Sequence, residues 1–277
     1  MEMKGKTALI TGATSGIGRI SAKELARQGM QLVLPVRDME KGEALKKEIE
    51  SENKGARVDV MHCDLASMAS IRDFAAAFKK KYKQLHVLLN NAGLWEVKRK
   101  VSKDGIEMNF AVNHLAPFLL TNLLLEVIRA SAPARIVNVS STAHKQTRMR
   151  FDDLEGNGRW SSLQTYAQGK LANIFFTREL ARRLEGSGVT VNALHPGVVR
   201  TRLFDKMPGP FRKLFGLFMI SPEKGAQTSI YLATSPEVEG VSGEYFIKKK
   251  VARTSKHARD MEVARRLWEV SEAYCKR

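Results

Sequence analysis

Short apolar runs rich in β-branched residues alternate with longer amphipathic segments along the 277-residue chain. Between the runs the apolar spacing becomes helical, as in Ile20–Gln28 and Glu223–Thr234. Strands joined by crossover helices form a mostly parallel sheet with helices on both faces. Because this length fits one large α/β domain, we expect residues 1–277 to form a single domain. We predict seven strands, at Thr7–Thr11, Gln31–Val36, Val58–His62, Val87–Asn90, Arg135–Ser140, Val189–His195 and Gly243–Ile247.

A glycine-rich turn, Thr11-Gly-Ala-Thr-Ser-Gly-Ile-Gly18, lies where the first predicted strand ends and the first helix begins. Gly12, Gly16 and Gly18 allow the backbone to turn sharply and to approach a pyrophosphate, which the amides and dipole of the helix N-terminus would stabilise. An ordinary tight turn can carry the same triplet, but its place after the first strand favours a dinucleotide. The candidate binding residues are Gly12, Thr14, Ser15, Gly16, Ile17 and Gly18.

The end of the second predicted strand bears on the type of dinucleotide. Enzymes for the unphosphorylated cofactor usually place a carboxylate here, against the ribose 2′-hydroxyl. This strand ends at Val36, and Arg37 follows, which would pair with a 2′-phosphate. We therefore predict NADP(H) in preference to NAD(H), with Arg19 and Lys41 as supporting candidates. The alternative is that Asp38 turns inward and Arg37 is only a solvated surface residue.

Tyr166 and Lys170 are four residues apart, and this spacing places both on one face of a helix. An adjacent ammonium favours the phenolate, so we expect the pKa of Tyr166 to fall toward the working range of an acid–base group. Such a pair is often only a surface contact. Ser141 strengthens the catalytic interpretation because it lies at the C-terminal end of a predicted parallel strand, directly after Ser140, at the edge where open α/β sheets bind ligands.

These motifs resemble the short-chain dehydrogenase/reductase family, in the expected order along nearly the whole chain. The matching positions are Thr11–Gly18, Asp64, Asn90-Asn-Ala-Gly93, Asn113, Ser140-Ser141, Tyr166 with Lys170, and His195-Pro-Gly-Val198 with Thr201. The resemblance implies a Rossmann-type, doubly wound, mostly parallel seven-stranded sheet in a single domain. It also implies hydride transfer to or from a nicotinamide.

The resemblance implies a role for each matching residue. Tyr166 would be the acid–base group, Ser141 would orient the substrate oxygen, Lys170 would tune Tyr166 and bind the nicotinamide ribose, and Asn113 would anchor a proton-relay water. Asp64 and Leu65 would bind the adenine side, and Asn91, Ala92 and Gly93 the adenosine pocket. Pro196, Gly197, Val198 and Thr201 would hold the nicotinamide. The alternatives are that Asp64 caps a helix, Asn113 satisfies backbone groups and His195 is a core residue; His195 has no predicted chemical role.

Within the family the chain is most similar to the retinol dehydrogenase branch and related lipid carbonyl reductases. The residues that carry this likeness are Val36–Gly42, Val139–His144, Phe151–Leu154, Lys170–Asn173 and His195–Thr201. We therefore expect an apolar aldehyde, ketone or alcohol as substrate. Residues 200–222 form a predicted substrate lid with an apolar composition, which would admit a long apolar aldehyde, touch a membrane surface, close the pocket or form a subunit interface. Its apolar residues are Phe204, Met207, Phe211, Leu214, Phe215, Leu217, Phe218 and Met219.

The chain carries a formal charge of +17, which attracts anions such as dinucleotides, nucleic acid or acidic lipids. Part of this excess lies in a basic C-terminal extension, residues 248–277, which we expect to be a solvated surface. No nucleic-acid-binding module is recognised, so we expect no specific nucleic-acid partner; a salt-sensitive gel shift would test that alternative. The other alternative is a non-catalytic NADPH-binding regulator or scaffold, whose sign would be a lost catalytic residue.

Less specific features of the sequence bear on the cellular location and the oligomeric state of the protein. Cys63 and Cys275 suggest neither a disulfide framework nor a metal site, which favours a reducing, cytoplasmic setting. We expect no signal peptide or membrane anchor before the first strand, and we expect the apolar stretch Phe118–Ile128 to be too short to span a bilayer. The resemblance further implies a homodimer or homotetramer, formed through the helices that contain Asn113 and Tyr166.

Overall fold

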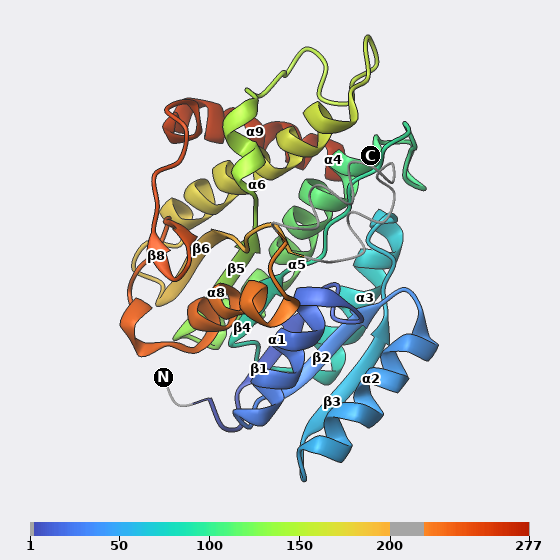
Figure 1. Ribbon diagram of the computed structural model, residues 1–277, viewed down its shortest axis with the longest axis vertical. Helices are drawn as coiled ribbons and strands as arrows, with labels where there is room; N and C mark the ends of the chain where they lie inside the picture. The colour runs from blue at the N-terminus through green and yellow to red at the C-terminus, as the bar shows by residue number, and fades with distance from the viewer. Residues whose placement is uncertain (1–2, 200–218, 277) are drawn as a thin grey trace.

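The computed structural model describes residues 3–199 and 219–276. Its central sheet has the strand order β3-β2-β1-β4-β5-β6-β7-β8 (Figure 1). All pairings from β3 to β7 are parallel, as predicted. The strands are β1 Thr7–Ile10, β2 Gln31–Val36, β3 Arg57–His62, β4 Val87–Asn90, β5 Ala134–Val139, β6 Val189–His195, β7 Tyr245–Ile247 and β8 Lys250–Val251.

The eighth strand, β8, was not predicted. It pairs antiparallel with β7 over two register positions, and the turn between them contains Lys248 and Lys249 at φ values of 51° and 65°. Turns of this kind normally contain glycine or asparagine because other residues resist a positive φ. Two lysines therefore gave no hairpin signal in the sequence.

Helices cover both faces of the sheet, as a doubly wound fold requires (Figure 1). One core lies between the sheet and α1, α2 and α8, and the other lies between the sheet and α3, α5 and α6. The helices are α1 Gly16–Arg27, α2 Met39–Glu52, α3 Met68–Lys81, α4 Met108–Phe110, α5 Ala116–Ala130, α6 Ser162–Arg183, α8 Pro222–Thr234 and α9 Met261–Cys275. A π-helical turn, Ala111–Leu115, joins α4 to α5, and a 3-10 turn, Thr142–Gln146, follows β5.

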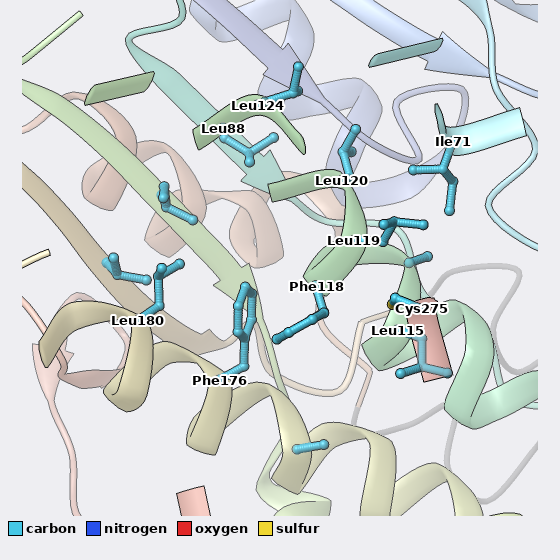
Figure 2. Packing of buried hydrophobic residues seen from close by; sticks show 14 of the residues in the cluster. Ile71, Leu88, Leu115, Phe118, Leu119, Leu120, Leu124, Phe176, Leu180 and Cys275 are labelled. Carbon is cyan, nitrogen blue, oxygen red and sulfur yellow. The ribbon is translucent and has the colours of Figure 1, made fainter. Parts of the chain in front are cut away.

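The apolar stretch at Phe118–Ile128 belongs to a longer helical unit than the sequence suggested. The unit Met108–Ala130 has 23 residues and is long and apolar enough to cross a membrane by those two criteria alone. However, 72% of its most apolar window is buried inside the molecule. Figure 2 shows Phe118, Leu119 and Leu120 packed among the side chains of neighbouring elements. Packing in the core therefore accounts for its apolar character.

The C-terminal extension is only in part the solvated surface that its charge suggested: residues 248–251 are exposed, but the helix that follows is packed on the core. Helix α9 packs on α5 and α6, and the ring of Trp268 lies 4.9 Å from that of Phe118 and 6.0 Å from that of Phe176. The exposed face of α9 carries charges of both signs, with Arg265 and Arg266 beside Glu262, Glu269 and Glu272. The prediction failed because it considered only the charged residues. The segment also has apolar residues at helical spacing, including Leu267 and Trp268, and these form the buried face of α9. Helix α9 thus covers part of the two helices through which subunit contacts were expected.

Candidate active site

The glycine-rich turn has the geometry that brings a helix N-terminus close to a ligand. Gly12 and Gly16 have φ values of +66° and +53°, which residues with a side chain rarely adopt. A Cβ on Gly18 would lie 2.3 Å from the Gly12 carbonyl oxygen, so only glycine lets α1 start this close to the turn. Among the described residues, the N-cap Ser15 donates or accepts no side-chain capping bond, and the first amides of α1 lack intrahelical partners. Thr14, Ser15 and Gly16 are partly exposed, whereas Ile17 is buried.

The loop after β4 is hydrogen-bonded to this turn. The Asn91 side-chain amide donates to the carbonyl oxygens of Thr11 and Gly12, at 2.9 and 3.3 Å. The Ala92 amide donates to the Thr11 hydroxyl at 2.9 Å. Thr11 therefore begins the turn and links it to the loop after β4, and it is not the last residue of β1. The motif Asn90–Gly93 thus lies beside the glycine turn.

At the end of β2, Arg37 is exposed, and it forms no ion pair with any residue in the described part of the chain. Asp38 does not turn inward: it caps α2 by accepting the Lys41 amide, 3.1 Å away, and pairs with the Lys41 ammonium. The hydrogen bond from that ammonium lowers the pKa of Asp38. Arg19 pairs with Glu48 of α2, so both supporting cations are already engaged.

Asp64 lies just after β3 and is nearly buried. Its carboxylate accepts the Ala66 amide at 3.0 Å and pairs with Lys103, also at 3.0 Å. Burial alone would raise the pKa of Asp64, but the Ala66 amide and the Lys103 ammonium bring it below its usual value. The cap of α3 is Ser67, so Asp64 is not the helix cap considered as its alternative role. Leu65 beside it is partly exposed.

Lys170 connects the glycine side of the site to the tyrosine. Its ammonium donates to the Val139 carbonyl at 3.1 Å, and a Cβ built on Gly93 would lie 2.9 Å from it. Burial lowers the pKa of Lys170 to about 8. Asn113 lies in the π-helical turn and both accepts from the Leu94 amide and donates to the Leu94 carbonyl, each at 2.9 Å. It satisfies backbone groups, as its alternative role predicted, and its oxygen also lies beside Gly93.

Tyr166 lies on α6 between Lys170 and Ser141. The Lys170 ammonium is 5.8 Å from the centroid of the Tyr166 ring, and the Tyr166 and Ser141 hydroxyls are hydrogen-bonded. Burial raises the pKa of Tyr166 to about 12, and the Ser141 bond lowers it only in part. The expected lowering by Lys170 is therefore wrong for this state, because removing the phenol from water costs more than its neighbours recover. Ser140 points elsewhere and donates to the Lys170 carbonyl at 2.7 Å.

Trp95 is part of this site, although the sequence analysis did not select it. Its ring stacks on that of Tyr166, with centroids 5.3 Å apart and an interplanar angle of 26°. The indole nitrogen donates to the Ser162 hydroxyl at 2.6 Å, and Ser162 donates to the Glu96 carbonyl at 2.7 Å. The available signal was its position, two residues after Gly93, where an aromatic side chain can reach the carboxyl edge of the sheet.

The segment after β6 approaches the glycine turn. Gly197 has a φ of +97°, and a Cβ there would lie 2.6 Å from Ile220, while Val199 packs with Ile17 in a small core cluster. Pro196 is half-buried and Val198 is 36% exposed. His195 accepts the Thr142 amide at 3.3 Å, and burial lowers its pKa to about 4, which fits a core histidine. Thr201 and lid residues 200–218 lie outside the described residues.

Comparisons with known proteins show the family to which the chain belongs. The sequence profile described as short chain dehydrogenase matches residues 6–209. The chain belongs to this family. Human retinol dehydrogenase 13 is 49% identical over 276 residues, which are 95% of this chain and 82% of that protein. Human retinol dehydrogenase 11 is 46% identical and covers 98% of this chain and 86% of its own length.

Solved structures show the same fold. An uncharacterised protein from Mycobacterium paratuberculosis superposes with a TM-score of 0.80 at 32% identity, over 99% of this chain and 95% of its own. A variant of actinorhodin polyketide ketoreductase, solved with NADPH, has a TM-score of 0.71 at 25% identity, over 87% of this chain and 95% of its own. As a short-chain dehydrogenase the protein is an oxidoreductase that uses a nicotinamide cofactor. The left-handed glycines and the free amides of α1 fit the pyrophosphate of such a cofactor.

Proposed function

We propose that the protein is an NADP(H)-dependent oxidoreductase that interconverts an apolar aldehyde or ketone and its alcohol. The observation that supports this most directly is the continuous row of groups from Gly93 through Lys170 and Tyr166 to Ser141. The row begins beside the glycine turn and ends at the carboxyl edge of β5. A fold that separated Lys170 from Tyr166, or placed them away from the turn, would have removed the basis for catalysis.

The protein's own residues would bind the substrate oxygen and move a proton. The bound nicotinamide supplies or accepts the hydride. Ser141 would donate a hydrogen bond to the substrate carbonyl, and Tyr166 would donate the proton that completes reduction. A charged Lys170 near the phenol lowers the cost of forming the phenolate at that moment. Asn113, whose oxygen lies beside Gly93, is placed to support proton transfer toward Lys170.

The preference for NADP(H) rests on charges at the end of β2. Arg37 is exposed and free to bind a 2′-phosphate, whereas the Asp38 carboxylate is held by Lys41 and by its capping bond. This removes the carboxylate that would favour NAD(H). The NADPH found in the related polyketide ketoreductase is in keeping with this preference. We assign Asp64, Leu65, Asn91, Ala92 and Gly93 to the adenosine side of the cofactor.

The proposed substrate class rests on the relatives named retinol dehydrogenases and on the apolar composition of residues 200–222, which we propose as the lid. The substrate would be retinal, retinol or another lipid carbonyl or alcohol. We propose a cytoplasmic location because Cys63 and Cys275 are free and buried. Any homo-oligomer would need surfaces other than those that α9 covers.

The decisive experiment follows NADPH oxidation with a panel of aldehydes and ketones that includes all-trans-retinal. Tyr166→Phe is the control variant, because it keeps the ring and removes the proton donor. We expect turnover of at least one long apolar aldehyde by the wild type and a loss of about 100-fold or more in Tyr166→Phe. Equal activity of the two proteins would refute the mechanism, and no turnover of any carbonyl would favour a non-catalytic NADPH-binding role.

A further inference from the structure

A cavity of about 680 Å³ opens beside the turn that follows β5, and it does not include any residue of the glycine turn. Three segments that are distant in sequence form its wall: residues 145–150, the start of α6 and residues 255–257. The lining residues are Lys145, Gln146, Thr147, Arg148, Arg150, Ser161, Leu163, Gln164, Ala167, Ser255, Lys256 and His257. The cavity thus lies against the segments that carry Ser141 and Tyr166, but it is separate from the predicted cofactor site.

The charged side chains that line this cavity are all basic. Its described lining contains two lysines, two arginines and a histidine, and no carboxylate. Lys145, Arg148 and Lys256 are exposed and form no ion pair with any described residue, while Arg150 has only a 3.9 Å contact with Asp153. At least three positive charges therefore face one concave space without a protein partner. Because like charges repel, such a group is stabilised when an anion binds among them.

A second cavity of the same molecule shows that this is not a general result of the +17 charge. That cavity, of about 860 Å³, is lined by four arginines, Arg135, Arg178, Arg182 and Arg259. It also contains three carboxylates, Glu185, Glu239 and Glu244, which offset most of that charge. The molecule therefore neutralises one basic cavity internally and leaves the other unneutralised.

Nearby histidines respond to this uncompensated charge. His257, a lining residue, has a pKa lowered by burial and further by Arg148, while Asp260, outside the lining, raises it in part. Burial also lowers the pKa of His144 and of His195, and Lys145 adds to both effects. The positive potential is thus felt inside the protein around the cavity, which agrees with the absence of carboxylates from its described lining.

We propose that this cavity, defined by Lys145, Arg148 and Lys256, is a binding site for the phosphate group of a ligand other than the dinucleotide. A phosphate carries up to two negative charges and several acceptor oxygens, so it can bind an arginine and two lysines from different segments at once. The concave shape favours a discrete phosphate group over a flat polyanionic surface. The phosphate would belong either to a free small molecule or to a lipid headgroup, which offer the same chemistry.

The test uses the whole protein saturated with NADPH, so that the cofactor site is filled. Inorganic phosphate is titrated at constant ionic strength, set with chloride, and binding is followed by calorimetry. Acetylation of lysines is measured by mass spectrometry with and without phosphate. We expect Lys145 and Lys256 to be protected, and Lys80, at the end of α3, to be unprotected. The double variant Arg148→Ala/Lys256→Ala should bind phosphate at least tenfold more weakly, whereas Lys80→Ala should bind as the wild type does.

A second arm identifies the source of the phosphate. The same proteins are mixed with phosphatidylcholine vesicles that contain, or lack, phosphatidic acid. Binding to the acidic vesicles that the double variant loses and Lys80→Ala retains would assign the cavity to a lipid phosphate. Binding of inorganic phosphate alone would assign it to a small molecule. If wild type and double variant behave alike in both arms, the proposal is wrong; Lys145→Gln gives the same test if the double variant is unstable.

Discussion

The indole of Trp95 lies against the ring of Tyr166, 5.3 Å between centroids, and is fixed there by its hydrogen bond to Ser162. Ser162 lies one helical turn before Tyr166 on α6, so the same helix carries the tyrosine and the anchor of the ring that covers it. This contact helps to bury Tyr166, and burial is the main reason that the pKa of Tyr166 is raised. Trp95 therefore bears on both the position and the acidity of the proposed acid.

Replacing Trp95 with alanine should expose Tyr166 to water and lower its pKa. Carbonyl reduction needs the protonated phenol, so activity is lost as pH rises through that pKa, and the loss should begin at lower pH in Trp95→Ala. We also expect kcat/KM to fall roughly threefold to tenfold, the effect of losing an aromatic contact. Trp95→Phe keeps a ring and should stay near the wild type. Superimposable pH profiles of kcat/KM for Trp95→Ala and wild type would contradict this role.

Lys170 should reduce stability at neutral pH while it serves catalysis. Burial lowers its pKa to about 8, against 10.5 for the ordinary side chain. At pH 7 the ammonium is therefore charged in both states, but the charge is less favourable in the folded protein than in the unfolded chain, and this lowers the free energy of unfolding. Lys170→Met should abolish turnover and raise the free energy of unfolding at pH 7 by roughly 2–3 kcal/mol. The Val139 carbonyl keeps Asn173 as a donor in this variant.

The stability gain of Lys170→Met should depend on pH in a defined direction. Between pH 8 and 10.5 the unfolded chain binds more protons at this position than the folded protein, so wild-type stability rises relative to the variant. The difference between the two proteins should be largest below pH 8 and shrink toward pH 10.5. Thermal or urea unfolding at several pH values measures it. A constant difference across this range would show that Lys170 does not titrate as its burial implies.

Arg37→Ala should weaken NADPH specifically. A charge-assisted hydrogen bond to a phosphate contributes about 1.5–3 kcal/mol, so we expect KM for NADPH to rise roughly 10- to 100-fold. KM for NADH should change little because NADH has no 2′-phosphate. Lys80→Ala removes one exposed charge in the last turn of α3 and controls for the general effect of net charge. A wild type that prefers NADH, with no change in Arg37→Ala, would overturn the NADP(H) assignment.

Gly93→Ala should reduce turnover more than stability. The added methyl group would lie 2.9 Å from the Lys170 ammonium and 3.1 Å from the Asn113 oxygen. The flexible lysine can move away, so the fold should survive with a loss within about 1 kcal/mol, but the ammonium would leave its place near Tyr166. We expect kcat to fall about tenfold or more. Gly158→Ala, whose nearest contact is 3.5 Å away, is the matched control, and equal kcat values for the two variants would argue against this positioning.

The arrangement of the site was largely predictable because its residues lie at the carboxyl ends of parallel strands. The glycine turn follows β1, Asn91 follows β4 and Ser141 follows β5, and parallel strands bring these ends to one edge. The i,i+4 spacing of Tyr166 and Lys170 then places both on one face of α6. Strand ends were less exact: Thr11 leaves β1 because its hydroxyl bonds the Ala92 amide, a contact that no local pattern encodes.

The features that could not be predicted from the sequence depend on contacts between segments that are distant in the chain. The raised pKa of Tyr166 reflects burial, to which Trp95 contributes from another loop. The basic cavity joins Arg148 and Lys256, more than a hundred positions apart. The role of α9 was missed because its exposed arginines suggested a solvated segment, although the spacing of Leu267, Trp268 and Ser271 is that of a buried helical face.

Trp268→Ala should test whether α9 is part of the folded core. The indole packs on Phe118 and Phe176, and the Arg183 guanidinium lies 4.0 Å from the indole ring centroid, so its loss leaves a cavity between three helices. We expect the free energy of unfolding to fall by about 3 kcal/mol or more. Arg265→Ala, on the exposed face of the same helix, should change it by less than about 0.5 kcal/mol. Urea unfolding measures both, and equal small effects would mean that α9 is only loosely attached.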